Sequence, residues 1–231
     1  DSVSFSTLLQ MTQTFRLRWI LACSFGEFIG MAIAAGLAAG HGLLFGEPAS
    51  YLDKVGLLGT MILAGLLEGL VVALFQWRIL RHRFKHLPAR GWLRVTATAA
   101  VIAWLLGMMP SLLQAGDTAA GWDGGLSLQF FGGLMLGFFL GALFGIFQWT
   151  QLKQYADQSV QWITGNAIGW ALGLAVIFIF AGSVPAGTAT WLVALLGATA
   201  GLLAGLIVGT TTSFFMPPVK KHEQLTSAKA A

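Results

Sequence analysis

The sequence predicts an all-α membrane protein: a six-transmembrane-helix bundle built from three parallel two-helix repeats, with both termini in the cytoplasm. Three observations support this prediction: six long apolar stretches, a one-sided distribution of Lys and Arg, and a recurring pattern of small residues. Of the 231 residues, 56% are hydrophobic and 10% are charged, whereas soluble domains carry about 25% charged residues. A core of this size cannot hide so much apolar surface from water, so lipid is the natural solvent.

Six apolar stretches reach the length of about 20 residues that the hydrocarbon core of a bilayer requires. They lie at about 17–40, 55–80, 92–114, 127–152, 160–182 and 188–215. Each should be helical, because lipid offers backbone groups no hydrogen-bond partner and the segment must satisfy its own. We expect one membrane domain over residues 1–231.

The positive charges fix the orientation of the predicted bundle. All Lys and Arg residues except Lys54 fall on one side of a six-span arrangement. The positive-inside rule therefore places both termini in the cytoplasm, in a bacterial inner membrane or a photosynthetic membrane. This placement also accounts for the sequence pI of about 9.6 without a nucleic-acid partner.

The loop between the second and third spans is the most basic segment of the chain. We expect it to bind lipid headgroups or to dock an acidic partner. Its predicted contact residues are Arg78, Arg81, Arg83, Lys85 and Arg90.

The even-numbered spans share a pattern of small residues spaced four apart. In the second and fourth spans a Gln-Trp pair follows the pattern, and 72 residues separate the two copies without a gap. The sixth span retains the small residues and has lost the pair. Residues four apart lie on one helix face, so each set forms a groove that lets another helix approach closely. The groove glycines are Gly65, Gly69, Gly137, Gly141, Gly145, Gly197, Gly201 and Gly205.

The odd-numbered spans align in a second register, in which a Trp near the start is followed by two small residues. The matching residues are Trp19, Gly26 and Gly30 in the first span, Trp92, Ala99 and Ala103 in the third, and Trp162, Gly169 and Gly173 in the fifth. Two registers that agree in three copies predict repeats at about 16–82, 90–154 and 160–216, followed by a cytoplasmic tail at 217–231.

Each Trp is predicted to pack against the Gln of its own hairpin, Trp19 with Gln76 and Trp92 with Gln148. An indole N–H bonded to an amide would satisfy polar groups that lipid cannot satisfy. The alternatives are an interfacial aromatic belt, with the Gln side chains reaching headgroups, and a ligand-binding role.

Two acidic residues, Glu27 and Glu68, lie near the predicted bilayer midplane on adjacent helices of one hairpin. A carboxylate that faced lipid at this depth would be costly, so both side chains should face the bundle. Two carboxyls that approach closely cannot both ionise cheaply, so at least one should carry a proton at neutral pH. With Asn166 of the fifth span, they form the predicted intramembrane polar site.

Such a site suits proton relay, cation coordination or a hydrogen bond to a ligand. The alternatives are that the carboxyls only fix the register of the helices, or that they contact a partner subunit. The other two repeats lack both carboxyls, so any site is asymmetric.

Known catalytic and metal-binding motifs do not occur in the sequence. There is no Gly-x-Ser-x-Gly turn, no His-Glu-x-x-His and no phosphate-binding loop. The single Cys23 excludes an internal disulfide and a cysteine-based zinc cluster, and no metal site is predicted. The sequence requires no cofactor and is compatible with a bound pigment or lipid.

The motif Gly-x3-Gly-x6-Gln-Trp-x2-Leu occurs at Gly65, Gly69, Gln76, Trp77 and Leu80, and again at Gly137, Gly141, Gln148, Trp149 and Leu152. It resembles a repeat of small multi-pass bacterial membrane proteins, cyanobacterial ones among them, and this resemblance covers two hairpins and implies no activity. The chain is also similar in size and span number to the substrate-binding subunits of energy-coupling-factor vitamin transporters. Those subunits carry a small-residue face on an early helix, as Gly26, Gly30 and Ala34 do here.

The first functional hypothesis is a non-catalytic integral membrane subunit that packs with partner proteins, lipids or pigments in a larger complex. The alternative is a small-solute or proton-coupled transport or substrate-binding protein with Glu27 and Glu68 at its centre. A transporter should have a polar cavity at the carboxyl pair, whereas a subunit should present a large apolar face to a partner.

Overall fold

The computed structural model describes residues 5–113, 125–185 and 187–220 and is all-helical there apart from turns and one isolated bridge. The helices are α1 (Phe5–Phe45), α2 (Tyr51–Arg83), α3 (Ala89–Leu113), α4 (Gly125–Leu152), α5 (Gln161–Gly182) and α6 (Thr190–Phe214). All six are long and apolar enough to cross a membrane. The prediction of an all-α chain with six such helices is confirmed, and residues 221–231 of the predicted tail lie outside the described part.

Most helix boundaries agree with the local sequence signals. Ser50 caps α2 in a capping box: its hydroxyl accepts from the Asp53 backbone at 3.2 Å, and its own N–H donates to the Asp53 carboxylate at 2.8 Å. Helix α1 begins well before the predicted position, since no Gly or Pro interrupts the preceding segment. Pro110 lies inside α3 near its end, within the predicted third span.

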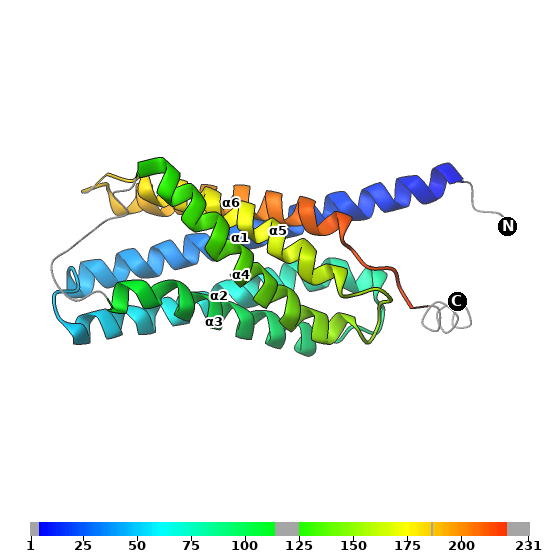
Figure 1. Ribbon diagram of the computed structural model, residues 1–231, viewed down its shortest axis with the longest axis horizontal. Coiled ribbons are helices and arrows are strands. Elements are labelled where there is room, and N and C mark those ends of the chain that lie inside the picture. The colour runs from blue at the N-terminus through cyan, green and yellow to red at the C-terminus, as the bar shows by residue number, and fades with distance from the viewer. Residues whose placement is uncertain (1–4, 114–124, 186, 221–231) are drawn as a thin grey trace.

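The six helices form a closed ring. Among the described residues, the backbone of each helix approaches closely only the two helices next to it in chain order, and α6 closes the ring on α1. The smallest of these six contacts is between α3 and α4. Figure 1 shows the helices lying along the long axis, with the start of α1 and the end of α6 at the same end of the bundle.

The groove glycines of α2, α4 and α6 allow close approach to the next helix around the ring. A Cβ added at Gly205 of α6 would lie 2.6 Å from the Cys23 carbonyl oxygen of α1. One at Gly69 of α2 would lie 2.9 Å from the Cα of Ala97 in α3, and Gly145 of α4 faces α5 in the same way. Such distances leave no room for a side chain, so these helices meet backbone to backbone.

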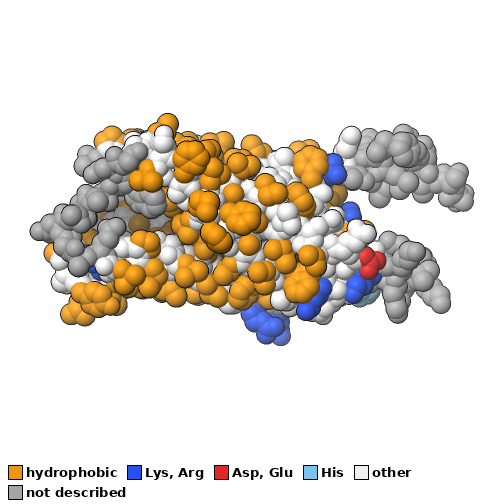
Figure 2. Space-filling model, viewed as in Figure 1, with side chains coloured by type: hydrophobic (Ala, Val, Ile, Leu, Met, Phe, Trp, Pro, Cys, Tyr) orange, Lys and Arg blue, Asp and Glu red, His pale blue; other side chains and the backbone are white. Residues whose placement is uncertain are grey.

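The outer surface of the bundle is apolar along most of its length. Figure 2 shows hydrophobic side chains covering the body of this face, with Lys and Arg gathered toward one end. Large side chains such as Phe131 and Phe139 are more than half exposed. This surface is consistent with an integral membrane protein, since a soluble monomer rarely exposes so large an apolar area.

We call the end of the ring that carries the α2–α3 and α4–α5 connections and residues 215–220 the basic end, and the opposite end the outer end.

Candidate functional site: a central cavity beside two buried carboxyls

Glu27 of α1 and Glu68 of α2 are buried side by side inside the ring, with 2% and 8% of their surface exposed. Their carboxyl groups are hydrogen-bonded to each other. Trp104 of α3 donates its indole N–H to Glu68 Oε2 at 2.5 Å. Gly30 of α1 admits the Glu68 side chain, because an added Cβ there would lie 2.6 Å from Glu68 Cγ. A hydrogen bond between two carboxyls requires a proton on one of them.

Within the part of the chain that the structure describes, the carboxyl pair has no cationic partner. Glu27 Oε2 is buried and has no hydrogen-bond partner within the described part of the chain. The sequence places no Lys or Arg between Arg18 and Lys54, between Lys54 and Arg78, or between Arg94 and Lys153. A buried polar atom without a partner costs free energy, so this oxygen needs an explanation beyond packing.

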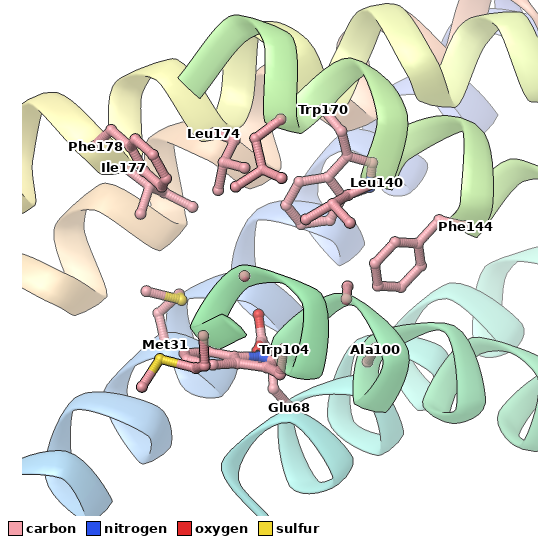
Figure 3. A pocket seen from close by; sticks show the side chains of 14 residues that line it. Met31, Glu68, Ala100, Trp104, Leu140, Phe144, Trp170, Leu174, Ile177 and Phe178 are labelled. Carbon is pink, nitrogen blue, oxygen red and sulfur yellow. The ribbon is translucent and has the colours of Figure 1, made fainter. Parts of the chain in front are cut away.

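A cavity of about 220 Å³ opens beside the pair. Its wall includes Met31 of α1, Glu68 of α2, Trp104 of α3, Leu140 of α4 and Trp170 of α5. Figure 3 shows Glu68 and Trp104 on one side of the cavity, opposite Leu140 and Trp170. Glu68 supplies the only ionisable side chain of the described wall, and the rest is aliphatic or aromatic apart from a glycine and the indole N–H groups of Trp104 and Trp170.

The cavity lies where α3 and α4 make little contact. In the first hairpin Gly26 and Gly30 let α1 approach α2, whereas the matching positions of α3 are Ala99 and Ala103. Ala103 lines the cavity, and so does Gly107 one turn later. A Cβ added at Gly107 would meet no atom within 4 Å, so the wall is open at this position.

Between the cavity and the basic end, the three Trp residues of the odd helices meet inside the ring. The ring centroids of Trp19 and Trp162 are 5.7 Å apart and those of Trp92 and Trp162 are 6.5 Å apart, both in edge-to-face geometry. All three side chains are at most 1% exposed. We call them, with the polar groups that surround them, the Trp–Gln cluster; its other members are Gln76, Thr96, Gln148 and Thr212.

The predicted Trp–Gln pairing within one hairpin is wrong. Trp19 donates to Thr212 Oγ1 of α6 at 2.9 Å, and Trp162 of α5 donates to Gln148 Oε1 of α4 at 3.0 Å. The Trp92 indole N–H is buried and has no acceptor among the described residues. The physical reason is the direction of the grooves: α4 and α6 press their glycines against the next hairpin, so the polar residue that ends each groove reaches the Trp of that hairpin.

Thr212 was missed because its chemistry differs from that of Gln. The signal was present, since Thr212 follows Gly209 by three residues as Gln148 follows Gly145. Trp104 was missed as well. Its signal was an indole donor deep in an apolar span, where a buried N–H must find an acceptor.

Asn166 lies apart from the carboxyl pair. It is buried in α5, where its amide donates to the Trp162 carbonyl oxygen one turn earlier at 2.9 Å. The hydrogen bonds of Glu27 and Glu68 do not include it. The predicted polar site is therefore divided between two levels of the ring.

The predicted basic patch has one member with a different environment. Arg83 is half-buried, stacks over the rings of Phe15 and Phe84, and donates to the Pro217 carbonyl oxygen at 3.3 Å. It ties the segment after α6 to the bundle. The other predicted residues of the patch are exposed: Arg78, Arg81, Lys85 and Arg90.

The described residues contain no group of three or more His, Cys, Asp or Glu side chains that could hold a metal ion. No protein-family model, curated protein or solved structure matches the chain. The class that the structure defines is a helical membrane protein, and its function must be argued from the chemistry of the cavity.

Proposed function

We propose that this protein is an integral membrane binding protein that holds a small, mainly apolar molecule in its central cavity, with the Glu68 carboxyl as the polar contact. The observation that carries the proposal is a cavity of about 220 Å³ with one buried carboxyl in an otherwise nearly apolar wall. An apolar cavity of about 150 Å³ is known to bind benzene, so scaling by volume gives room for roughly nine to ten non-hydrogen atoms. Ligand sites are typically apolar with few convergent polar groups.

In this proposal the chain consists of three parallel two-helix repeats, and the basic end faces the cytoplasm. Equivalent groove glycines, such as Gly69, Gly141 and Gly205, each face the next hairpin around the ring, which supports the repeat. The charge distribution supports the orientation. The buried Trp–Gln cluster then separates the cavity from the cytoplasm, so the ligand enters from the membrane or from the outer end.

The hypothesis of an accessory subunit stays a prediction. An apolar outer surface is what contact with lipid requires, and no observation assigns part of it to a partner protein. A cavity beside two buried carboxyls favours the binding hypothesis, because a purely structural bundle gains nothing from it.

A cavity-filling substitution tests the proposal. Gly107→Leu places a side chain at the open part of the wall without meeting any atom within 4 Å of its Cβ. Gly59→Leu is the matched control, because Gly59 is a helical glycine of α2 with equally open surroundings and is not part of the cavity wall. Both replacements also favour the helix, so neither should unfold the protein.

The measurement is saturable binding of tert-butylbenzene to the purified protein in nanodiscs, and calorimetry is the method that detects it. Because the probe partitions into the nanodisc lipid to the same extent for every variant, comparison between the variants removes this contribution. We expect wild type and Gly59→Leu to bind alike and Gly107→Leu to bind at least about tenfold more weakly, since the side chain occupies the volume that the probe needs. Equal binding by all three proteins would contradict the proposal.

A further inference from the structure

We infer that the natural ligand of the cavity is a small organic cation, held by the Glu68 carboxyl of the Glu27–Glu68 pair and by the aromatic faces around it. This inference rests on the proposed function and specifies the chemical class of its ligand. Three independent features of the cavity support it: a missing positive charge, a carboxyl oxygen without a partner, and the aromatic residues of the wall.

The missing charge follows from the titratable groups around Glu68. From α1, Glu27 contacts Glu68, Cys23 lies one turn from Glu27 and contacts Gln76, and His41 lies farther toward the outer end, bonded to Thr60. From α3, no ionisable residue follows Arg94, which lies near the basic end. Helices α4, α5 and α6 contain no Asp, Glu, Lys, Arg or His.

No cationic side chain among the described residues lies beside the carboxyl pair, so the pair stays neutral, with a proton on each carboxyl, until a cation binds and replaces one of them. A buried charge without a partner is strongly unfavourable. Glu68 forms part of the cavity wall, so a cation in the cavity would supply the missing charge at hydrogen-bonding or ion-pair distance.

The second feature is Glu27 Oε2, which is buried and lacks a hydrogen-bond partner in the described structure. Its residue is only 2% exposed, so water at the protein surface does not satisfy it. Glu27 is hydrogen-bonded to Glu68. A cationic ligand that changes the hydrogen bonding of Glu68 therefore also affects Glu27. Glu27 is not part of the cavity wall, so it acts on the ligand through Glu68.

The third feature is the aromatic part of the wall. Trp104 and Trp170 line the cavity, and Phe144 lines it while stacked on Trp170 with ring centroids 5.4 Å apart. Ring faces attract cations within about 6 Å, by up to about 2 kcal/mol when the site is desolvated. A neutral polyol would find few partners here, because the wall carries almost no other polar group.

Cation and proton compete in this arrangement. The hydrogen bond between the carboxyls holds a proton, and a cation favours the ionised form of the same groups. Cation affinity should therefore rise with pH, in the limit by about tenfold per pH unit when one proton leaves for each cation bound. The affinity for a neutral molecule of the same shape should not change with pH.

The experiment compares phenyltrimethylammonium with tert-butylbenzene, which has the same shape and no charge. The quaternary ammonium carries no exchangeable proton, so any proton that appears on binding comes from the protein. Binding to nanodisc-embedded protein is measured by calorimetry in two buffers of different ionisation enthalpy at about pH 6 and about pH 8. The variants are Glu68→Gln, which preserves the acceptor for Trp104, and Glu47→Gln, a matched change at an exposed acidic residue.

We expect wild type and Glu47→Gln to bind the cation at least about tenfold more tightly than the neutral probe at the higher pH. These two proteins should release protons when they bind phenyltrimethylammonium and none when they bind tert-butylbenzene. Glu68→Gln should lose this preference and the proton release while it still binds tert-butylbenzene, which shows that it is folded.

Two other outcomes would overturn the inference. If both probes bind equally at both pH values, the cavity binds apolar molecules without charge recognition, and the proposed function stands alone. If wild type binds neither probe, the proposed function fails together with the cation inference.

Discussion

The Trp–Gln cluster can be tested by a double-mutant cycle centred on Gln148. Gln148 Nε2 donates to Gln76 Oε1 at 3.2 Å and to Thr96 Oγ1 at 3.1 Å. Its Oε1 accepts from the Trp162 indole at 3.0 Å, and the side chain is 2% exposed. Gln148→Leu removes all three bonds and leaves the Trp162 N–H buried without its acceptor.

The magnitude follows from the number of bonds lost. Hydrogen bonds between helices in a membrane contribute about 0.6 kcal/mol on average and up to about 1.7 kcal/mol. Three of them give about 2 kcal/mol, and the orphaned indole donor adds about 1–3 kcal/mol. We therefore expect Gln148→Leu to lower the free energy of unfolding by about 3–5 kcal/mol.

The cycle isolates the bond that crosses between hairpins. With Trp162→Phe, Gln148→Leu should show a coupling of at least about 1.5 kcal/mol, because the two changes remove the same hydrogen bond and the double mutant no longer contains the orphaned indole. With Trp92→Phe the coupling should stay below about 0.5 kcal/mol, because the Trp92 N–H donates to no acceptor. The assay is reversible unfolding in mixed micelles by a denaturing detergent. A larger coupling for Trp92 than for Trp162 would refute the contacts across hairpins.

Two further predictions concern packing and topology. Gly205→Leu should abolish monodisperse folded protein in fluorescence-detected size-exclusion chromatography, because its Cβ would lie 2.6 Å from a backbone oxygen of α1. Gly36→Leu, where a Cβ meets nothing within 4 Å, should leave the elution profile unchanged. Cys23 is 1% exposed, so the native chain should resist an impermeant maleimide. Cysteine introduced at Glu47 should then react from outside intact cells and cysteine at Lys85 only after permeabilisation, and the reverse pattern would contradict the orientation.

The existence of the helices could be predicted from the sequence because it depends on local composition. A stretch of about 20 apolar residues suffices to span a bilayer, and lipid forces its backbone into a helix. Boundaries outside the apolar stretch are weaker signals. Helix α1 extends beyond its apolar part because nothing in the preceding residues stops it.

The partners of each helix could not be predicted in the same way. A groove such as that of Gly137, Gly141 and Gly145 identifies the face of a helix that packs closely, but not the helix that fills it. Two neighbours were possible for α4, and the structure places its groove against α5 rather than α3. This choice decides that Gln148 bonds to Trp162 instead of Trp92.

The cavity had no local signal, because it depends on which side chains fail to meet. Ala99 and Ala103 take the place of two glycines, and α3 approaches α4 less closely than the other neighbours approach each other. Burial of the two carboxyls followed from the cost of exposing them to lipid. That Glu68 forms part of a cavity wall and accepts from Trp104 depends on helix placement around the whole ring.

Each of the two levels of polar groups inside the ring leaves one buried polar atom without a partner among the described residues, Trp92 Nε1 and Glu27 Oε2, but the surroundings of the two levels differ. In the Trp–Gln cluster, Trp19, Trp162 and Gln148 find partners on neighbouring helices, as expected for a network that fixes the packing. At the carboxyl level one oxygen lacks a partner and the wall is open. The groove does not require an acid there. The residues before the equivalent glycines Gly69, Gly141 and Gly205 are Glu68 in α2, a leucine in α4 and an alanine in α6. Apolar replacement of a buried charged group is often neutral or stabilising, so packing alone would favour a leucine at position 68 as well. In the proposed function, a bound ligand offsets the stability that this carboxyl costs, and this cost distinguishes a ligand site from a structural contact.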